Sequence, residues 1–157
     1  MNQPRSRSPE FPDGVSSDAL LQLGWALYVS NSPFTAPHGA MYQKIDDNGV
    51  CWRAFCARKM HCNSAGIVHG GMLATFMDAL MGLTVAHGAQ TTALTVHLTI
   101  EYPAIARPGD WIIGQSRITQ LTDATAYVEG EAHAGARQLI SAQGVFKLMR
   151  RRAPRAK

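Results

Sequence analysis

Residues 63–87 read NSAGIVHGGMLATFMDALMGLTVAH, and this stretch decides the fold of the 157-residue chain. Its first part, residues 63–71, is polar and glycine-rich. The run that follows, residues 72–86, is almost wholly apolar, and its Met, Leu and Ala side chains favour helix over strand. Because apolar residues fall on every face of this helix, we expect it to be buried all round.

One ionisable side chain, Asp78, lies inside the apolar run. An unpaired carboxylate in an apolar core is costly, so a soluble protein rarely keeps one without using it. Asp78 is therefore a candidate functional residue. The run is also too short for a bilayer span and carries this charge in its middle, so we expect no membrane association.

The start of the helix has the features of an anion-binding site. His69-Gly70-Gly71 falls where the first backbone N–H groups of a helix lack intrahelical partners. Without a Cβ in the way, a carbonyl oxygen can approach these donors, and the helix dipole adds positive potential. These are the requirements of an oxyanion hole. The glycines alone favour a plain turn before a buried helix. With Asn63 before them and Asp78 after them, the functional interpretation becomes the better one.

The charge distribution argues against nucleic acid as a partner. The formal net charge is +4, but residues 1–13 and 150–157 carry seven Lys and Arg against two acids, whereas residues 14–149 carry eight against nine. The basicity therefore belongs to the two ends, and no basic face is implied.

The three cysteines, Cys51, Cys56 and Cys62, make an odd count without a secretory signal ahead of them. We interpret them as reduced packing residues of a cytoplasmic protein.

The sequence predicts one domain, residues 15–149, between a disordered tail, residues 1–14, and a basic C-terminal tail, residues 150–157. A helix is expected over residues 16–30, followed by strands over 41–45 and 50–60 on either side of an Asp-Asp-Asn-Gly turn. After the central helix, residues 91–102 alternate as a strand, and further strands are expected over 111–121, 125–134 and 138–149. Short hairpin links indicate an antiparallel sheet, which would wrap around the apolar helix in an α+β fold.

These residues resemble a known family. The pattern Asn63-x2-Gly66-x2-His69-Gly70-Gly71, with Asp78 in the helix, is similar to that of hotdog-fold acyl-CoA thioesterases. The branch it resembles most is the phenylacetate-pathway type, with relatives that act on 4-hydroxybenzoyl-CoA. The resemblance extends in order and spacing over roughly residues 40 to 149.

The resemblance implies a reaction and a role for each matching residue. The reaction is hydrolysis of an acyl-CoA thioester to the free acid and coenzyme A, and no cofactor is expected because coenzyme A is part of the substrate. Gly70 would supply the N–H that polarises the carbonyl, and Asp78 would act as base or nucleophile. Asn63 and His69 would help hold the thioester or the attacking water, which the Thr95 hydroxyl would help orient. His97 departs from the family, where Asp often stands.

The spacing of the two central residues predicts a dimer independently of the family. Gly70 and Asp78 are eight residues apart, which is roughly 12 Å along one helix at about 1.5 Å per residue. One thioester carbon cannot lie about 3 Å from both. Gly70 of one subunit should therefore share a site with Asp78 of a second copy, twice per two-fold dimer, and two dimers could pair further.

Other functions fit the sequence less well. His-Gly-Gly also occurs in the oxyanion loop of lipases, but no Gly-x-Ser-x-Gly nucleophile motif is present. No metal is expected, because no Cys or His pair has zinc-ligand spacing. His61, His87 and His133 are interpreted as surface or strand-end residues. A hotdog protein that binds acyl-CoA without turnover remains the alternative to a thioesterase, and a hotdog dehydratase is a weaker one.

Overall fold

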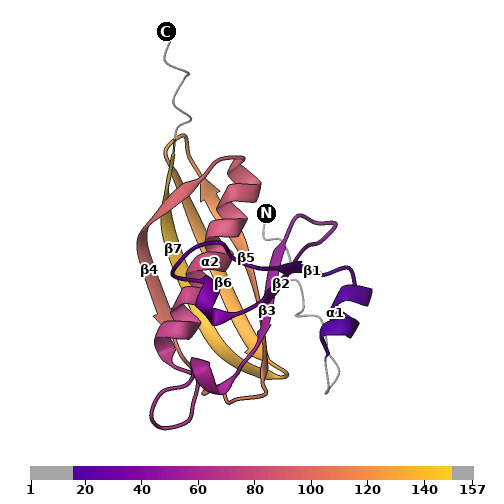
Figure 1. The fold of residues 1–157 in the computed structure, drawn as a ribbon. Helices are drawn as coiled ribbons and strands as arrows, with labels where there is room; N and C mark the ends of the chain where they lie inside the picture. Colours follow the sequence, from indigo (N-terminus) through magenta and orange to yellow (C-terminus); the bar gives the residue numbers. More distant parts are fainter. Residues whose placement is uncertain (1–15, 150–157) are drawn as a thin grey trace.

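The computed structural model describes residues 16–149, so the expected tails, residues 1–14 and 150–157, lie outside the described residues. Seven strands form one antiparallel sheet in the order β1-β2-β3-β5-β6-β7-β4 (Figure 1). The strands are β1 Ala26–Tyr28, β2 Met41–Ile45, β3 Cys51–Cys56, β4 Ala93–Glu101, β5 Trp111–Leu121, β6 Thr125–Ala134 and β7 Arg137–Leu148. The helices are α1 Ser17–Gln22 and α2 Gly70–Ala89, with short 3-10 turns η1 Ala36–His38 and η2 Lys59–His61.

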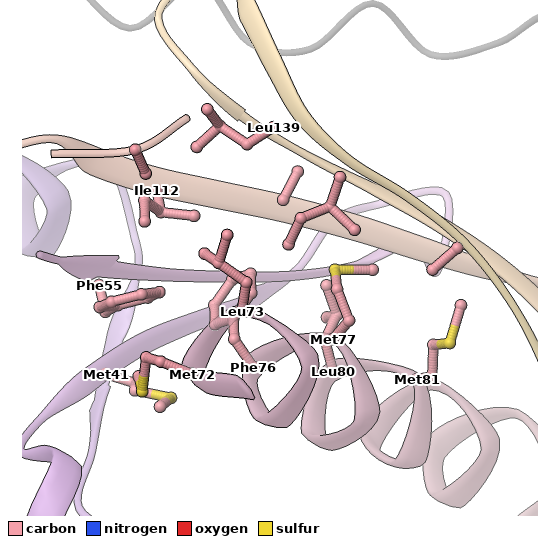
Figure 2. Close-up of a cluster of buried hydrophobic side chains, with 14 of the residues drawn as sticks. Met41, Phe55, Met72, Leu73, Phe76, Met77, Leu80, Met81, Ile112 and Leu139 are labelled. Atoms are coloured by element: carbon pink, nitrogen blue, oxygen red, sulfur yellow. The ribbon is translucent and has the colours of Figure 1, made fainter. Parts of the chain in front are cut away.

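The curved sheet wraps around α2, which confirms the predicted fold (Figure 1). Side chains of α2 such as Phe76, Met77 and Leu80 point toward the sheet and meet Phe55 and Ile112 (Figure 2). All five are 2% exposed or less. Burying a large apolar side chain of this kind stabilises the fold by about 1.5–3 kcal/mol, so the contact between α2 and the sheet is a large contribution to stability.

The predicted helix over residues 16–30 is wrong in its second half. Ser16 caps α1 by accepting from the Ala19 N–H, but the helix ends at Gln22. Gly24 adopts φ +80°, which a glycine tolerates and which breaks the helical path. Residues 26–28 then form β1, which pairs with the free edge of β2. Tertiary pairing outweighs the helical spacing of the leucines.

A second, smaller cluster explains what α1 does. Leu20, Trp25, Trp52, Ala54 and Ile113 are buried together. Along β3, Cys51, Arg53 and Phe55 alternate with Trp52 and Ala54, so the two sets lie on opposite faces of the sheet. The first set faces α2, and the second is covered by α1. Strand β3 is therefore buried on both faces.

Helix α2 is not buried all round in this chain, contrary to expectation. Met77 and Leu80 are buried, but Asp78 and Ala79 on the other side are only half-buried. The length argument was also wrong, because α2 has 20 residues and is long and apolar enough to cross a membrane by length and composition, as core helices often are. The sheet covers one side of the helix, and the half-buried side remains available.

Strand β4 breaks the predicted alternation. Its register to β7 shifts between Thr95 and His97, so Val96 is an extra residue in a β-bulge. The bulge switches the faces: Leu94 and Val96 are 57% and 64% exposed, whereas Leu98, two residues later, packs against the core. Thr95 therefore lies on the same side as Leu98, toward α2, although alternation placed the two on opposite faces.

Candidate active site

The carboxylate of Asp78 has one hydrogen-bond partner among the described residues. The Thr95 hydroxyl donates to Asp78 Oδ1 at 2.6 Å, and this bond connects the first half of β4 to the middle of α2. Asp78 is half-buried rather than isolated in the core, which corrects the expectation of an unpaired buried charge. Among the described residues, none donates to the second oxygen, Oδ2. That oxygen is free to accept from water or to approach a carbonyl carbon.

The first turn of α2 presents the expected donor. His69 is the N-cap, and its Nδ1 accepts from the Gly71 N–H at 2.8 Å. Because Nδ1 accepts, the ring proton of neutral His69 lies on Nε2, which can donate outward. The Gly70 N–H stands at the first helical position and has no acceptor among residues 16–149. It is therefore available to a ligand oxygen.

Tyr102 lies at this site, although the sequence analysis gave it no role there. Its hydroxyl donates to the Gly70 carbonyl at 3.1 Å, and its ring lies 3.7 Å from where a Cβ of Gly70 would be. Partial burial raises the pKa of the Tyr102 phenol, so it stays a donor at neutral pH. The sequence feature that could have identified Tyr102 is its position directly after β4, which we interpreted only as the end of a strand.

Asn63 shapes the loop before α2. Its Oδ1 accepts from the N–H groups of Ala65 and Ile67 at 3.0 and 3.4 Å, and its backbone N–H donates to the Ile67 carbonyl. Gly66 completes the turn at φ +75°. The side-chain oxygen of Asn63 is thus used within the loop, and only its amide NH2 remains for a ligand.

The five predicted site residues fall into two groups in one chain. Asp78 and Thr95 meet in the middle of α2, whereas His69, Gly70 and the Asn63 loop lie at its start. Eight residues of helix separate the groups, which is roughly 12 Å. The single chain therefore contains both halves of a possible site and does not bring them together.

His61 is buried, which corrects its interpretation as a surface residue. It is 4% exposed; its Nδ1 accepts from the Arg58 N–H, and its Nε2 donates to the His38 carbonyl at 3.0 Å. Burial lowers the pKa of His61. Its own carbonyl accepts from the His69 N–H at 2.8 Å, so His61 supports the loop that leads into α2.

The remaining polar clusters do not form a metal centre. His97 Nε2 lies 2.9 Å from Thr99 Oγ1 on the exposed face of β4. Between residues 16 and 149, no three His, Cys, Asp or Glu side chains are arranged to hold a metal ion.

A curved antiparallel sheet around one long helix, with a glycine-rich helix start, defines the hotdog class of proteins. The Thioesterase superfamily model matches residues 65–141. The proposed esterase PA0474 of Pseudomonas aeruginosa is 36% identical over 127 residues, which cover 80% of this chain and 95% of that protein. The chain therefore belongs to the thioesterase superfamily, and this membership supports a hydrolase in general terms.

Solved structures agree on the fold. The phenylacetic acid degradation protein PaaI of Thermus thermophilus is 19% identical with a TM-score of 0.68, over 75% of this chain and 100% of PaaI. A hypothetical thioesterase of Streptococcus pneumoniae, crystallised with coenzyme A, is 20% identical with a TM-score of 0.64, over 72% of this chain and 91% of that one. At these identities the similarity shows the hotdog fold alone.

Proposed function

We propose that this protein hydrolyses an acyl-CoA thioester to the free acid and coenzyme A. The observation that carries the proposal is the position of Asp78. Its carboxylate is reachable and is oriented by the Thr95 hydroxyl, and it lies on the same helix that exposes the Gly70 N–H at its start. Superfamily membership supports thioester chemistry, and the coenzyme A bound by the Streptococcus pneumoniae neighbour supports coenzyme A as the thiol.

Each group has a defined part in this reaction. The Gly70 N–H donates to the thioester oxygen and stabilises the negative charge that develops there. Asp78 either takes a proton from water as the water oxygen attacks, or attacks the carbonyl carbon itself and forms an anhydride that water then opens. In both routes the C–S bond breaks, and the thiolate of coenzyme A leaves and is protonated. Water supplies the hydroxyl of the acid.

The proposed active unit is a homodimer in which Gly70 of one copy faces Asp78 of the other. The half-buried side of α2 offers a surface for a facing helix. Strand β4 supports the same assembly, because it is a nine-residue edge strand with exposed Leu94 and Val96. A long apolar edge left unpaired is a liability in a soluble protein, and pairing with a second copy removes it.

Thiol release from a panel of acyl-CoA esters, followed with a thiol reagent, tests the proposal. We expect turnover of at least one aromatic, short-chain or medium-chain ester by the purified protein. Binding of these esters without thiol release would instead favour a sensor or carrier role, and the thioesterase proposal would be withdrawn.

A further inference from the structure

Arg53 is a charged residue buried on the side of the sheet that α2 covers. It is 5% exposed and lies in the middle of β3, between Cys51 and Phe55 on the face that α2 covers. Its Nη2 donates to Gln43 Oε1 at 3.0 Å, and its guanidinium carbon lies 4.8 Å from the centre of the Tyr28 ring. No carboxylate among the described residues lies within ion-pair distance of it.

This arrangement leaves hydrogen-bonding capacity unused. Arg53 Nε is buried and has no hydrogen-bond partner in the described part of the chain. Burial lowers the pKa of Arg53, but a guanidinium is basic enough to keep its charge in a protein at neutral pH. A buried positive charge with a free donor is costly unless an anion joins it.

Arg53 lines a pocket whose wall also includes Ala79, the residue after Asp78. The pocket has a cavity volume of about 30 Å³ and is partly open to solvent. Its walls come from Tyr28, Ser30, Thr35, Gly39, Met41, Arg53 and Ala79. Ala79 follows Asp78 directly in α2, and both lie on the half-buried side of the helix. The Ser30 and Thr35 hydroxyls, which bond each other, add polar atoms to the wall.

We propose that this pocket receives the far end of the acyl group and that Arg53 binds a carboxylate there, which makes the substrates ω-carboxyacyl thioesters. This inference rests on the proposed function and names its substrate class. The fork of N–H donors in a guanidinium matches a carboxylate, and the free Nε supplies one of them. Because Ala79 on the pocket wall directly follows Asp78 in α2, a short diacid chain bound at Arg53 would direct its thioester end toward the candidate carboxylate.

The test compares acyl pairs that differ only in the terminal carboxylate. Succinyl-, glutaryl- and adipyl-CoA are matched by butyryl-, valeryl- and hexanoyl-CoA. We expect wild-type kcat/KM to favour the carboxylated member of at least one pair by about 10²-fold, the range lost when one partner of a buried charge pair is removed. In Arg53→Met the ratio within that pair should fall to about 1 or below, whereas Arg53→Lys should keep part of it.

Arg117→Met is the matched control. Arg117 is half-exposed on β5, and its Nε donates to Glu129 Oε1 at 2.8 Å. This variant loses the same charge outside the pocket and should keep the wild-type ratio. An equal fall of both members of a pair in Arg53→Met would mean that Arg53 supports the fold or contacts coenzyme A, and it would overturn the inference, as would a wild-type preference for the neutral member in all three pairs.

A binding measurement separates this inference from the proposed function. Glutarate should raise the melting temperature of wild-type protein and of Arg117→Met but not of Arg53→Met, whereas neutral valeramide should raise none of them. If glutarate stabilises through Arg53 while no thioester is hydrolysed, the pocket stands and the hydrolase proposal fails. If thioesters are hydrolysed but glutarate has no effect on wild type, the carboxylate pocket is refuted.

Discussion

Replacing Asp78 with asparagine tests the proposed chemistry most directly. The change keeps the size of the side chain and an oxygen that can accept from Thr95, but it removes the base and the nucleophile. A positioned base supplies about 10²–10⁴-fold, so we expect kcat to fall by at least about 10²-fold. KM for the acyl-CoA should change far less, because the lost interaction acts in the transition state.

The structure also sets the expected effect on stability. The 2.6 Å bond from Thr95 to Asp78 becomes a bond to a neutral acceptor, and the difference between a charged and a neutral acceptor is about 1 kcal/mol. Asp78 is half-buried, so solvent reduces this further. For a chain of this size about 1 kcal/mol corresponds to about 2–4 °C in melting temperature. The melting temperature should therefore drop by no more than a few degrees.

The assay is thiol release under saturating substrate, with the melting temperature measured on the same preparation. Asp123→Asn is the control, because Asp123 is an exposed turn carboxylate whose loss should change neither quantity. If Asp78→Asn kept near-wild-type kcat, or lost stability heavily while turnover survived, Asp78 would be a structural residue and the catalytic assignment would be abandoned.

Three further predictions concern other parts of the molecule. Gly70→Val should lower kcat/KM by about 10²–10³-fold, which is the loss expected for one oxyanion donor, and full activity in the folded variant would contradict the donor role. Gly70→Ala should still fold, because its Cβ would lie at ordinary contact distance from Tyr102. Val96→Lys on the β4 edge should shift the protein from dimer to monomer in sedimentation and abolish turnover, and an active monomer would refute the shared site. Because the folded-state pKa of His61 is lowered, neutral His61 contributes stability that is fully present above the unfolded-state pKa of about 6.5 and is lost as pH falls below it. The melting temperature should therefore decline less between pH 7.5 and pH 5 in His61→Asn than in wild type, and equal declines would count against this.

The sequence determined the central architecture on its own. The apolar run after His69-Gly70-Gly71 contains enough helix-forming side chains to specify α2, and only a sheet could cover it. The turns that flank β5 and β6 placed both strands at their observed bounds, residues 111–121 and 125–134. These features depend on neighbours within a few residues, so local propensity and periodicity were sufficient.

Tertiary contacts decided the features that position the site. Residues 26–28 became a strand because the edge of β2 was free to pair, although the local spacing indicated a helix. The bulge at Val96 turned Thr95 toward Asp78, and no alternating pattern reveals where one residue is inserted. Tyr102 and Gly70 are joined by a hydrogen bond although 32 positions separate them in the sequence.

Arg53 shows the same division most clearly. In the sequence it is one arginine in an apolar strand, with nothing to distinguish it from an exposed charge. Only the packing of β1, β2 and α2 around β3 buries it and forms a pocket lined by Ala79, and within residues 16–149 its Nε then has no hydrogen-bond partner. Burial and pairing of a charge are properties of contacts between distant segments. The sequence by itself therefore determined the helix and the candidate residues on it, while the folded sheet decided which other side chains lie close to them.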